Sequence, residues 1–166
     1  VLAAAASQHN AELSNFGRGV STLLAQVSQP PTSSLAMLEI LSRPSASPSW
    51  RLRGCTLPCL RLVAYLSQFD GGASMAEARG PLLALLRDPR VEVREAARPI
   101  VAGFVRLHGA PARAQLLAWA DASASAKAAA DEQHAGLLAL VALLLQAPYD
   151  LPPWMPDIIR RVAGFL

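Results

Sequence analysis

The sequence predicts an all-α fold, and three features of its composition support this prediction. Hydrophobic residues make up 52% of the 166 residues, which excludes a disordered chain, because disorder requires low hydrophobicity and high charge. Aromatic residues make up only 5%, which argues against a β-sandwich or a β-barrel. Ala, Leu and Arg are abundant instead, and all three are good helix formers.

Apolar residues at helical spacing predict three helices in the first part of the chain, over residues 1–28, 32–41 and 50–68. A segment rich in Ser and Pro, 42–49, is expected to link the second helix to the third. Pro58 predicts a kink inside the third helix. The residues of the second helix expected to point inward are Leu35, Leu38, Ile40 and Leu41.

The chain has two cysteines, Cys55 and Cys59. Their spacing differs from the CxxC spacing of zinc and redox sites, and no second pair or nearby His completes a tetrahedral shell. We therefore expect two buried or half-buried thiols in a reducing compartment, without a disulfide or a metal.

The segment between residues 81 and 104 is the most informative for the fold. An apolar helix over 81–87 is followed by Asp88, a good N-cap, and Pro89, a good first residue of the next helix. Because the turn is very short, the two helices are expected to be antiparallel neighbours. The string Leu-Leu-x-Asp-Pro-x-x-x-Val-Arg-x-Ala-Ala resembles the turn and second helix of a HEAT repeat. The matching residues are Asp88, Val93, Arg94, Ala96 and Ala97.

This resemblance implies a HEAT/armadillo-type helical-repeat solenoid of antiparallel helix pairs, with roughly four pairs in the chain. Small residues such as Ala97 allow close approach of helices in such a repeat, and Arg94 can reach polar groups at the turn. We assign residues 1–126 to these HEAT-like repeats.

Further helices are expected over 91–104, 111–119 and 131–146, with a loop of small residues at 121–125. The third of these is apolar on all sides, so we expect it to be buried, and the acidic pair at its start suits the positive end of the helix dipole. A stiff, proline-rich turn over 147–157 is expected next. We expect Tyr149, Trp154 and Met155 to pack one helical hairpin against the next, and Pro156 to begin a last helix. The apolar stripe of that helix is Ile158, Ile159, Val162 and Phe165.

No sequence pattern indicates catalysis, so we do not expect an enzyme. Common catalytic and nucleotide-binding motifs are absent. His9, His108 and His134 are far apart, and the adjacent Asp131 and Glu132 cannot share a helix face as a paired acid and base would. We expect His134 to be a hydrogen-bonded core residue.

The net charge of +3 does not indicate a nucleic-acid interface, because the basic residues are spread along the chain. The longest apolar run, 135–147, is too short to span a bilayer, which needs about 20 residues. Neither a nucleic acid nor a membrane is therefore an expected partner. Since the chain starts at Val1 and stops at Leu166 inside an amphipathic pattern, we expect a piece of a longer protein.

Two strings near the C-terminal end are long and unusual: His-Ala-Gly-Leu-Leu at 134–138 and Ala-Pro-Tyr-Asp-Leu-Pro-Pro-Trp-Met-Pro at 147–156. They resemble the C-terminal region of the PA200/Blm10 family of proteasome activators, over about residues 50–166. The resemblance assigns 127–166 to the start of the family's C-terminal domain. The residues that carry it are His134, Ala135, Gly136, Pro148, Tyr149, Asp150, Pro152, Trp154, Met155 and Pro156.

The resemblance implies a function without catalysis. Family members are large HEAT-repeat proteins of the nucleus and cytoplasm that cap the 20S proteasome at its α-ring. They stimulate ATP- and ubiquitin-independent degradation, and they open the gate with a C-terminal tail that would lie beyond Leu166. Full-length members bind inositol phosphates, whereas no cofactor is expected in this segment.

The family is also linked to acetylated histones and DNA repair. This chain has His108-Gly109 where animal members carry Asn-Phe, and Gly can neither donate to an acetyl group nor wall a pocket. The resemblance therefore does not favour acetyl-lysine binding here. The alternative reading of the whole chain is a generic HEAT-repeat scaffold or adaptor for protein–protein interaction.

Overall fold

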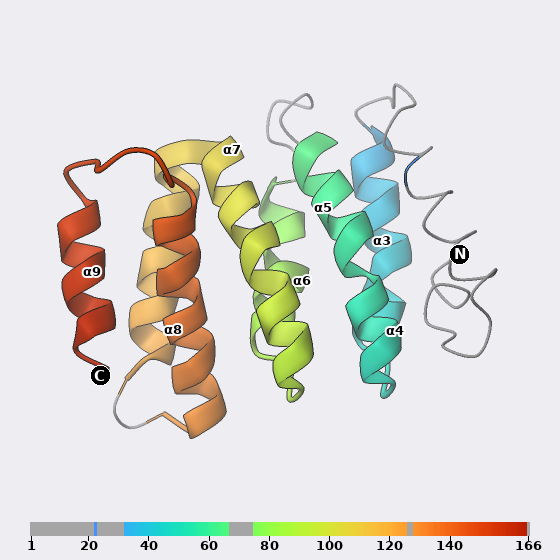
Figure 1. Cartoon of the computed structure of the whole chain (residues 1–166). Helices are drawn as coiled ribbons and strands as arrows, with labels where there is room; N and C mark the ends of the chain where they lie inside the picture. Colours follow the sequence, from blue (N-terminus) through green and yellow to red (C-terminus); the bar gives the residue numbers. More distant parts are fainter. Residues whose placement is uncertain (1–21, 23–31, 67–74, 126–127, 166) are drawn as a thin grey trace. The chain divides into compact units, whose positions relative to one another are not determined.

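The computed structural model describes residues 22, 32–66, 75–125 and 128–165; apart from Thr22, the expected helix over 1–28 lies outside them. The described residues form helices and turns without a strand, so the all-α prediction is confirmed for them (Figure 1). The chain divides into two compact units, Val1–Pro81 and Leu82–Leu166. The helices are α3 (Thr32–Ser45), α4 (Trp50–Cys55), α5 (Leu57–Leu66), α6 (Met75–Leu86), α7 (Val91–Ser123), α8 (Ala130–Leu145) and α9 (Met155–Ala163).

In the first unit, α3 packs against α4 and α5 and buries Leu38 and Leu41. Two expectations about α3 are wrong. The helix runs to Ser45, so the linker to α4 is shorter than the predicted 42–49. Ile40 is 70% exposed, because two residues along a helix turn by about 200° away from Leu38. Leu35 lies where the side chains are not described.

The kink predicted near Pro58 is a break between α4 and α5 at Thr56. The Thr56 side chain is buried, and its hydroxyl donates to the carbonyl of Arg53 over 2.6 Å. Pro58 lies in the first turn of α5, where its missing N–H leaves no helical hydrogen bond unmade.

Cys55 and Cys59 lie on either side of this break as half-buried thiols. Burial raises the pKa of the Cys55 thiol, and the neighbouring Cys59 raises it further. The expectation of half-buried thiols is confirmed.

In the second unit, the turn before α7 corrects the predicted N-cap. Arg90, with extended backbone angles, precedes the first residue of α7, and Asp88 lies two residues earlier. The Asp88 carboxylate accepts from the backbone N–H of Arg90 over 2.8 Å, so it closes the turn and does not cap the helix. The preceding helix, α6, starts at Met75, before the predicted start at residue 81, and contains Pro81.

Helix α7 consists of two helical segments that meet at Gly109, whose φ of 66° and ψ of −142° are open to glycine but strained for other residues. This arrangement matches the two helices predicted over 91–104 and 111–119. The second segment, however, extends to Ser123, through most of the predicted 121–125 loop. The Ala residues there favour the helix, and the buried Ser123 hydroxyl accepts from Arg87 over 2.8 Å.

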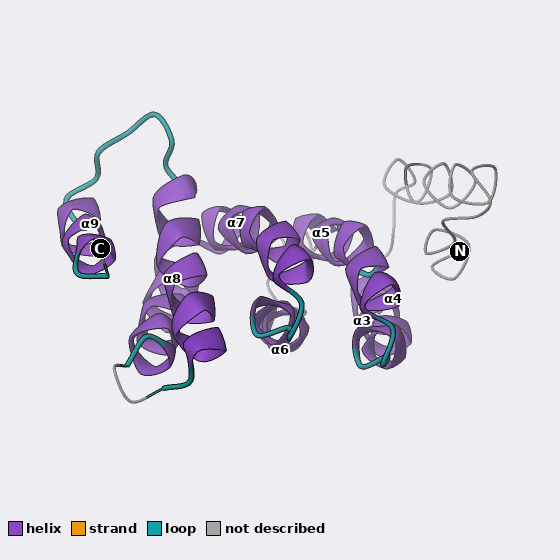
Figure 2. Ribbon diagram, turned by 60° about the horizontal axis from the view of Figure 1, so that its bottom comes forward, coloured by secondary structure: helices purple, strands orange, loops and turns teal. Residues whose placement is uncertain are grey.

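Helix α8 packs against both α7 and α9, as Figures 1 and 2 show. It begins within one residue of the predicted start and carries Asp131 and Glu132 in its first turn. It is not buried on all sides, because Leu145 is 43% exposed.

The short helix α9 has Pro156 as its second residue, one position later than predicted. It buries Met155 and Ile158, whereas Ile159 and Phe165 from the predicted apolar stripe stay exposed.

Candidate functional site

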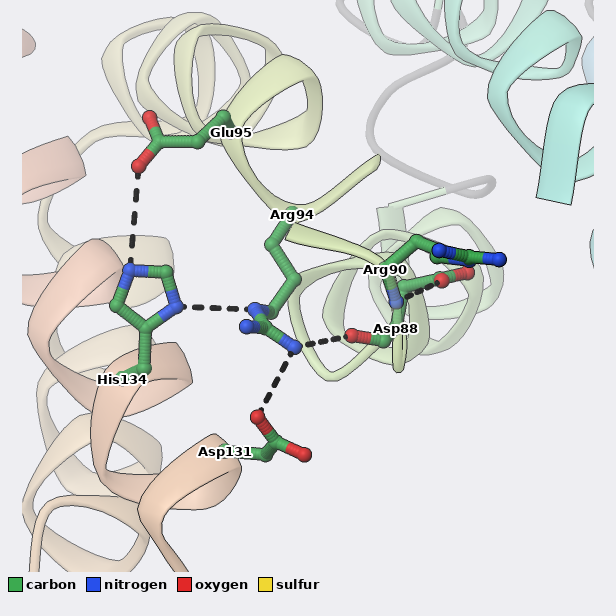
Figure 3. A network of polar contacts seen from close by, with 6 residues as sticks. All are labelled: Asp88, Arg90, Arg94, Glu95, Asp131 and His134. Carbon is green, nitrogen blue, oxygen red and sulfur yellow. Dashed lines mark hydrogen bonds and ion pairs between the residues drawn. The ribbon is translucent and has the colours of Figure 1, made fainter. Parts of the chain in front are cut away.

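Residues from two separate sequence motifs meet at the start of α8. Arg94, from the HEAT-like turn string, donates from Nε to Nδ1 of His134, from the His-Ala-Gly string, over 2.9 Å (Figure 3). The two residues are 40 positions apart in the chain. The Arg94 side chain is only 7% exposed although it is charged.

The buried guanidinium of Arg94 has two further partners. Its Nη1 donates to the backbone carbonyl of Asp88 over 2.6 Å, which confirms that Arg94 reaches the turn. The same Nη1 lies 3.4 Å from Oδ1 of Asp131. A buried charge is tolerated when it is hydrogen-bonded in this way. We call Asp88, Arg94, Asp131 and His134 the polar clasp, because they join the α6–α7 turn, α7 and α8.

The ring of His134 is hydrogen-bonded, as predicted, but it lies at the edge of the core with 32% of its surface exposed. Its Nε2 is 3.9 Å from Oε1 of Glu95, which also pairs with Arg98 over 3.1 Å. Metal-binding histidines usually donate from their second nitrogen to an acceptor. Here that nitrogen accepts from an arginine, so the arrangement fits a structural role and not a ligand role.

The glycine of the same string, Gly136, lies where helix packing leaves no room for a side chain. A Cβ placed on Gly136 would lie 2.6 Å from the backbone nitrogen of Ala124 and 2.8 Å from its Cβ. Only glycine therefore allows α8 to approach the end of α7 this closely. The neighbouring Ala135 is fully buried.

The HEAT-like turn residues Val93 and Ala97 are buried on α7, 1% and 0% exposed, whereas Ala96 is exposed. Their burial fits the helix-packing role expected of the turn string, and no described feature gives them a chemical one.

The second family string lies at the other end of α8, about 24 Å along the helix from the polar clasp. Residues 146–154 form the connection between α8 and α9, which we call the α8–α9 loop (Figure 1). Tyr149 is 96% exposed and Leu151 is 72% exposed. The prediction that Tyr149 packs between hairpins is therefore wrong.

The end of the string behaves as predicted. Met155 is buried. Trp154 is half-buried, and the guanidinium carbon of Arg113 lies over its ring, 4.8 Å from the ring centroid. Pro148, Asp150 and Pro156 are exposed, whereas Pro152 is half-buried. The loop is thus anchored at its α9 end and displays Tyr149 and Leu151 to solvent.

Sequence reasoning missed two other arginine contacts in this unit. Arg87 stacks on Trp119, with its guanidinium carbon 4.7 Å from the ring centroid, while it bonds Ser123. Arg161 of α9 forms an ion pair with Asp121 of α7. Both contacts join residues more than 30 positions apart, and no local pattern in the sequence signals them.

The described residues offer no assembled reaction centre that we can identify. Nowhere in 32–66, 75–125 or 128–165 do three or more His, Cys, Asp or Glu side chains gather in a way that could hold a metal ion. None of the described helices combines the length and apolarity needed to cross a bilayer.

Comparisons with known proteins agree on one family. A family model described as "Proteasome activator complex subunit 4-like, C-terminal" matches residues 130–166. Proteasome activator complex subunit 4A of Danio rerio is 30% identical over 155 residues, which cover 80% of this chain and 8% of that protein. Proteasome activator complex subunit 4 of Homo sapiens is 24% identical over 151 residues, which cover 78% of this chain and 8% of that protein. Proteasome activator subunit 4 of Arabidopsis thaliana is 31% identical over 131 residues, covering 70% and 7%.

The chain thus spans about 8% of the length of the first of these relatives. The matched segment 130–166 contains Asp131 and His134 of the polar clasp, Gly136 and the whole α8–α9 loop. The names of the relatives describe regulators of a protease and not catalysts. The predicted boundary after residue 126 stays a prediction. These matches confirm the resemblance and place the chain, as a segment, in the PA200/Blm10 family of proteasome activators.

Proposed function

We propose that this chain is a segment of a helical-repeat protein that caps the 20S proteasome at its α-ring and stimulates ATP- and ubiquitin-independent degradation. The similarity to subunits named proteasome activators, over 80% of the chain in one of them, is the observation that carries the proposal. HEAT-like stacking of the helix pairs belongs to the same proposal. The packing of α8 against both α7 and α9 supports it.

Within such a protein, this segment has a structural role. The polar clasp and Gly136 hold α8 against α7, and Arg161 joins α9 to Asp121 of α7. The side chains that carry the motif at the start of α8 are occupied by partners within the chain. Proteasome contact and gate opening would be supplied by the whole protein.

The direct test uses the full-length protein that contains this segment. We expect it to co-sediment with purified 20S particles and to accelerate hydrolysis of a fluorogenic peptide without ATP or ubiquitin. The control is the same reaction with an active-site inhibitor of the proteasome, which should abolish the increase. Failure to co-sediment would contradict the proposal. Binding to other proteins with unchanged peptide hydrolysis would favour the alternative, a generic helical-repeat scaffold.

We do not extend the proposal to acetylated histones. Gly109 lies at the break in α7 and has neither an amide side chain nor a ring. The ring of the neighbouring His108 contacts Phe104 at a tilt of 51°, with ring centroids 4.6 Å apart. The proposal includes three further properties drawn from the family. They are residence in the nucleus and cytoplasm, a link to DNA repair, and inositol phosphate binding by the full-length protein. Imaging of the tagged full-length protein tests the first of these.

A further inference from the structure

We propose that His134 is a proton-dependent switch in the polar clasp: its neutral ring holds Arg94, and its protonated ring releases Arg94 and turns to Glu95. One hydrogen bond in the polar clasp fixes which ring nitrogen carries the proton. Arg94 Nε–H donates to His134 Nδ1 over 2.9 Å (Figure 3). A guanidinium has donors but no acceptor, so Nδ1 must carry a lone pair and not a proton.

The neutral ring then carries its proton on Nε2. This nitrogen faces Oε1 of Glu95 at 3.9 Å, which is too long for a hydrogen bond. With 32% of the His134 side chain exposed, water reaches the ring, so it can exchange a proton with solvent while the helices stay folded.

Protonation changes what the ring can bind. Both nitrogens become donors, so the bond from Arg94 cannot form, and two cations then face each other. Glu95 from α7 and Asp131 from α8 attract the charged ring, while Arg94 repels it. Glu95 is the acceptor that Nε2 already faces, so the protonated ring exchanges one partner on α7 for another.

After the exchange, Arg94 keeps only two partners: Asp88 on the α6–α7 turn and Asp131 at the start of α8. Nη1 keeps the carbonyl of Asp88 and the carboxylate of Asp131, whereas Nε–H loses its acceptor. Histidine is the side chain most often used as a proton-dependent switch in proteins, so the exchange is sought by comparing an acidic with a mildly alkaline solution. The structural consequence is a looser link between the start of α8 and the buried arginine.

The experiment measures solvent exchange of the Arg94 Nε–H by NMR on the 15N-labelled 166-residue chain. His134→Gln is the informative variant, because a glutamine amide oxygen can accept from Arg94 at any pH. At about pH 5.5 we expect this proton to exchange about tenfold faster in the wild type than in His134→Gln, since the wild type has lost one hydrogen bond. At about pH 8 the two proteins should exchange at similar rates. The control is His108→Gln, which changes a different histidine that lies on α7. It should behave as the wild type does.

Two results would overturn the proposal. One is equal exchange of the Arg94 Nε–H in the wild type and His134→Gln at the lower pH. The other is a set of ring 15N shifts that places the proton of neutral His134 on Nδ1. The second measurement uses only the wild-type chain, so it decides the question even when the glutamine variant does not fold.

Discussion

The two ends of α8 reverse the usual distribution of polar and apolar residues in opposite ways. At the N-terminal end, the charged Arg94 is buried and reaches three partners. At the C-terminal end, Tyr149 and Leu151 are 96% and 72% exposed. Charged side chains are usually outside, and large apolar ones are usually inside. The comparison therefore divides the motif residues into two groups. Contacts within the chain explain the residues at the N-terminal end of α8, whereas they do not explain the exposed residues at its C-terminal end.

At the polar clasp, each motif residue has a partner or a steric reason. Arg94 and His134 bind each other, and Gly136 leaves room for Ala124. In the second family string, Trp154 and Met155 pack, but Tyr149 is almost fully exposed to solvent. The comparison predicts that substitutions at the clasp change stability, whereas those at the loop tip do not.

The largest effect is expected from Arg94→Met. It removes the buried guanidinium and its hydrogen bonds to His134 and Asp88, so the free energy of unfolding should fall by about 3 to 5 kcal/mol. Urea unfolding of the chain, followed by circular dichroism, measures this. The matched control is Arg98→Met on the same helix, whose partner Glu95 is 43% exposed. A control loss as large as that of Arg94→Met would show that the clasp has no special role.

Gly136→Ala should come next. The added methyl would lie 2.6 Å from a backbone nitrogen that cannot move without shifting α7, so we expect a loss of about 3 kcal/mol. Gly103→Ala is the control, because nothing lies within 4 Å of the new Cβ. In the middle of a helix the control should raise stability by about 0.5 to 1 kcal/mol. Equal effects of the two substitutions, measured by the same unfolding assay, would contradict the close approach of α8 to α7.

Gly109→Ala should cost less. Here too the space is open, so only the backbone angle opposes the substitution. Forcing alanine to a φ of 66° costs about 1 to 2 kcal/mol, and the lower entropy of the unfolded alanine chain offsets part of it. Thermal unfolding should show a net loss of about 1 kcal/mol. A gain in stability would mean that the two α7 segments join without the break at Gly109.

Tyr149→Ala should have the smallest effect. Since the side chain is 96% exposed, the free energy of unfolding should change by less than about 0.5 kcal/mol. Met155→Ala in the same string removes a buried side chain and should cost about 2 to 4 kcal/mol. If calorimetry finds that Tyr149→Ala is as damaging as Met155→Ala, the loop tip packs after all.

Helix positions were predictable from the sequence wherever apolar periodicity was strong, as at the start of α8 and on both sides of Gly109. Boundaries were less predictable, because small and polar residues continue a helix when it is supported by packing. Ser123 shows this, since its bond from Arg87 comes from a residue 36 positions away. The two-residue error at Asp88 has a different cause: an Asp before Pro can close a turn as readily as it can cap a helix.

The site was half predictable. The two motifs that supply Arg94 and His134 could each be found locally, but their pairing depends on how α8 lies against α7, which no local pattern contains. The exposure of Tyr149 was missed for the opposite reason: an aromatic residue among prolines favours packing by composition alone, and only the path of the loop shows that it points to solvent.

A double-mutant cycle between Arg94 and His134 at about pH 8 tests the polar clasp most directly. The four proteins are the wild type, Arg94→Met, His134→Ala and the double variant, compared by the free energy of unfolding in urea. We predict a coupling of about 1 kcal/mol or more, because the charged donor and the ring nitrogen bind each other. Additive losses, with a coupling near zero, would show that the two residues act independently and would contradict the account.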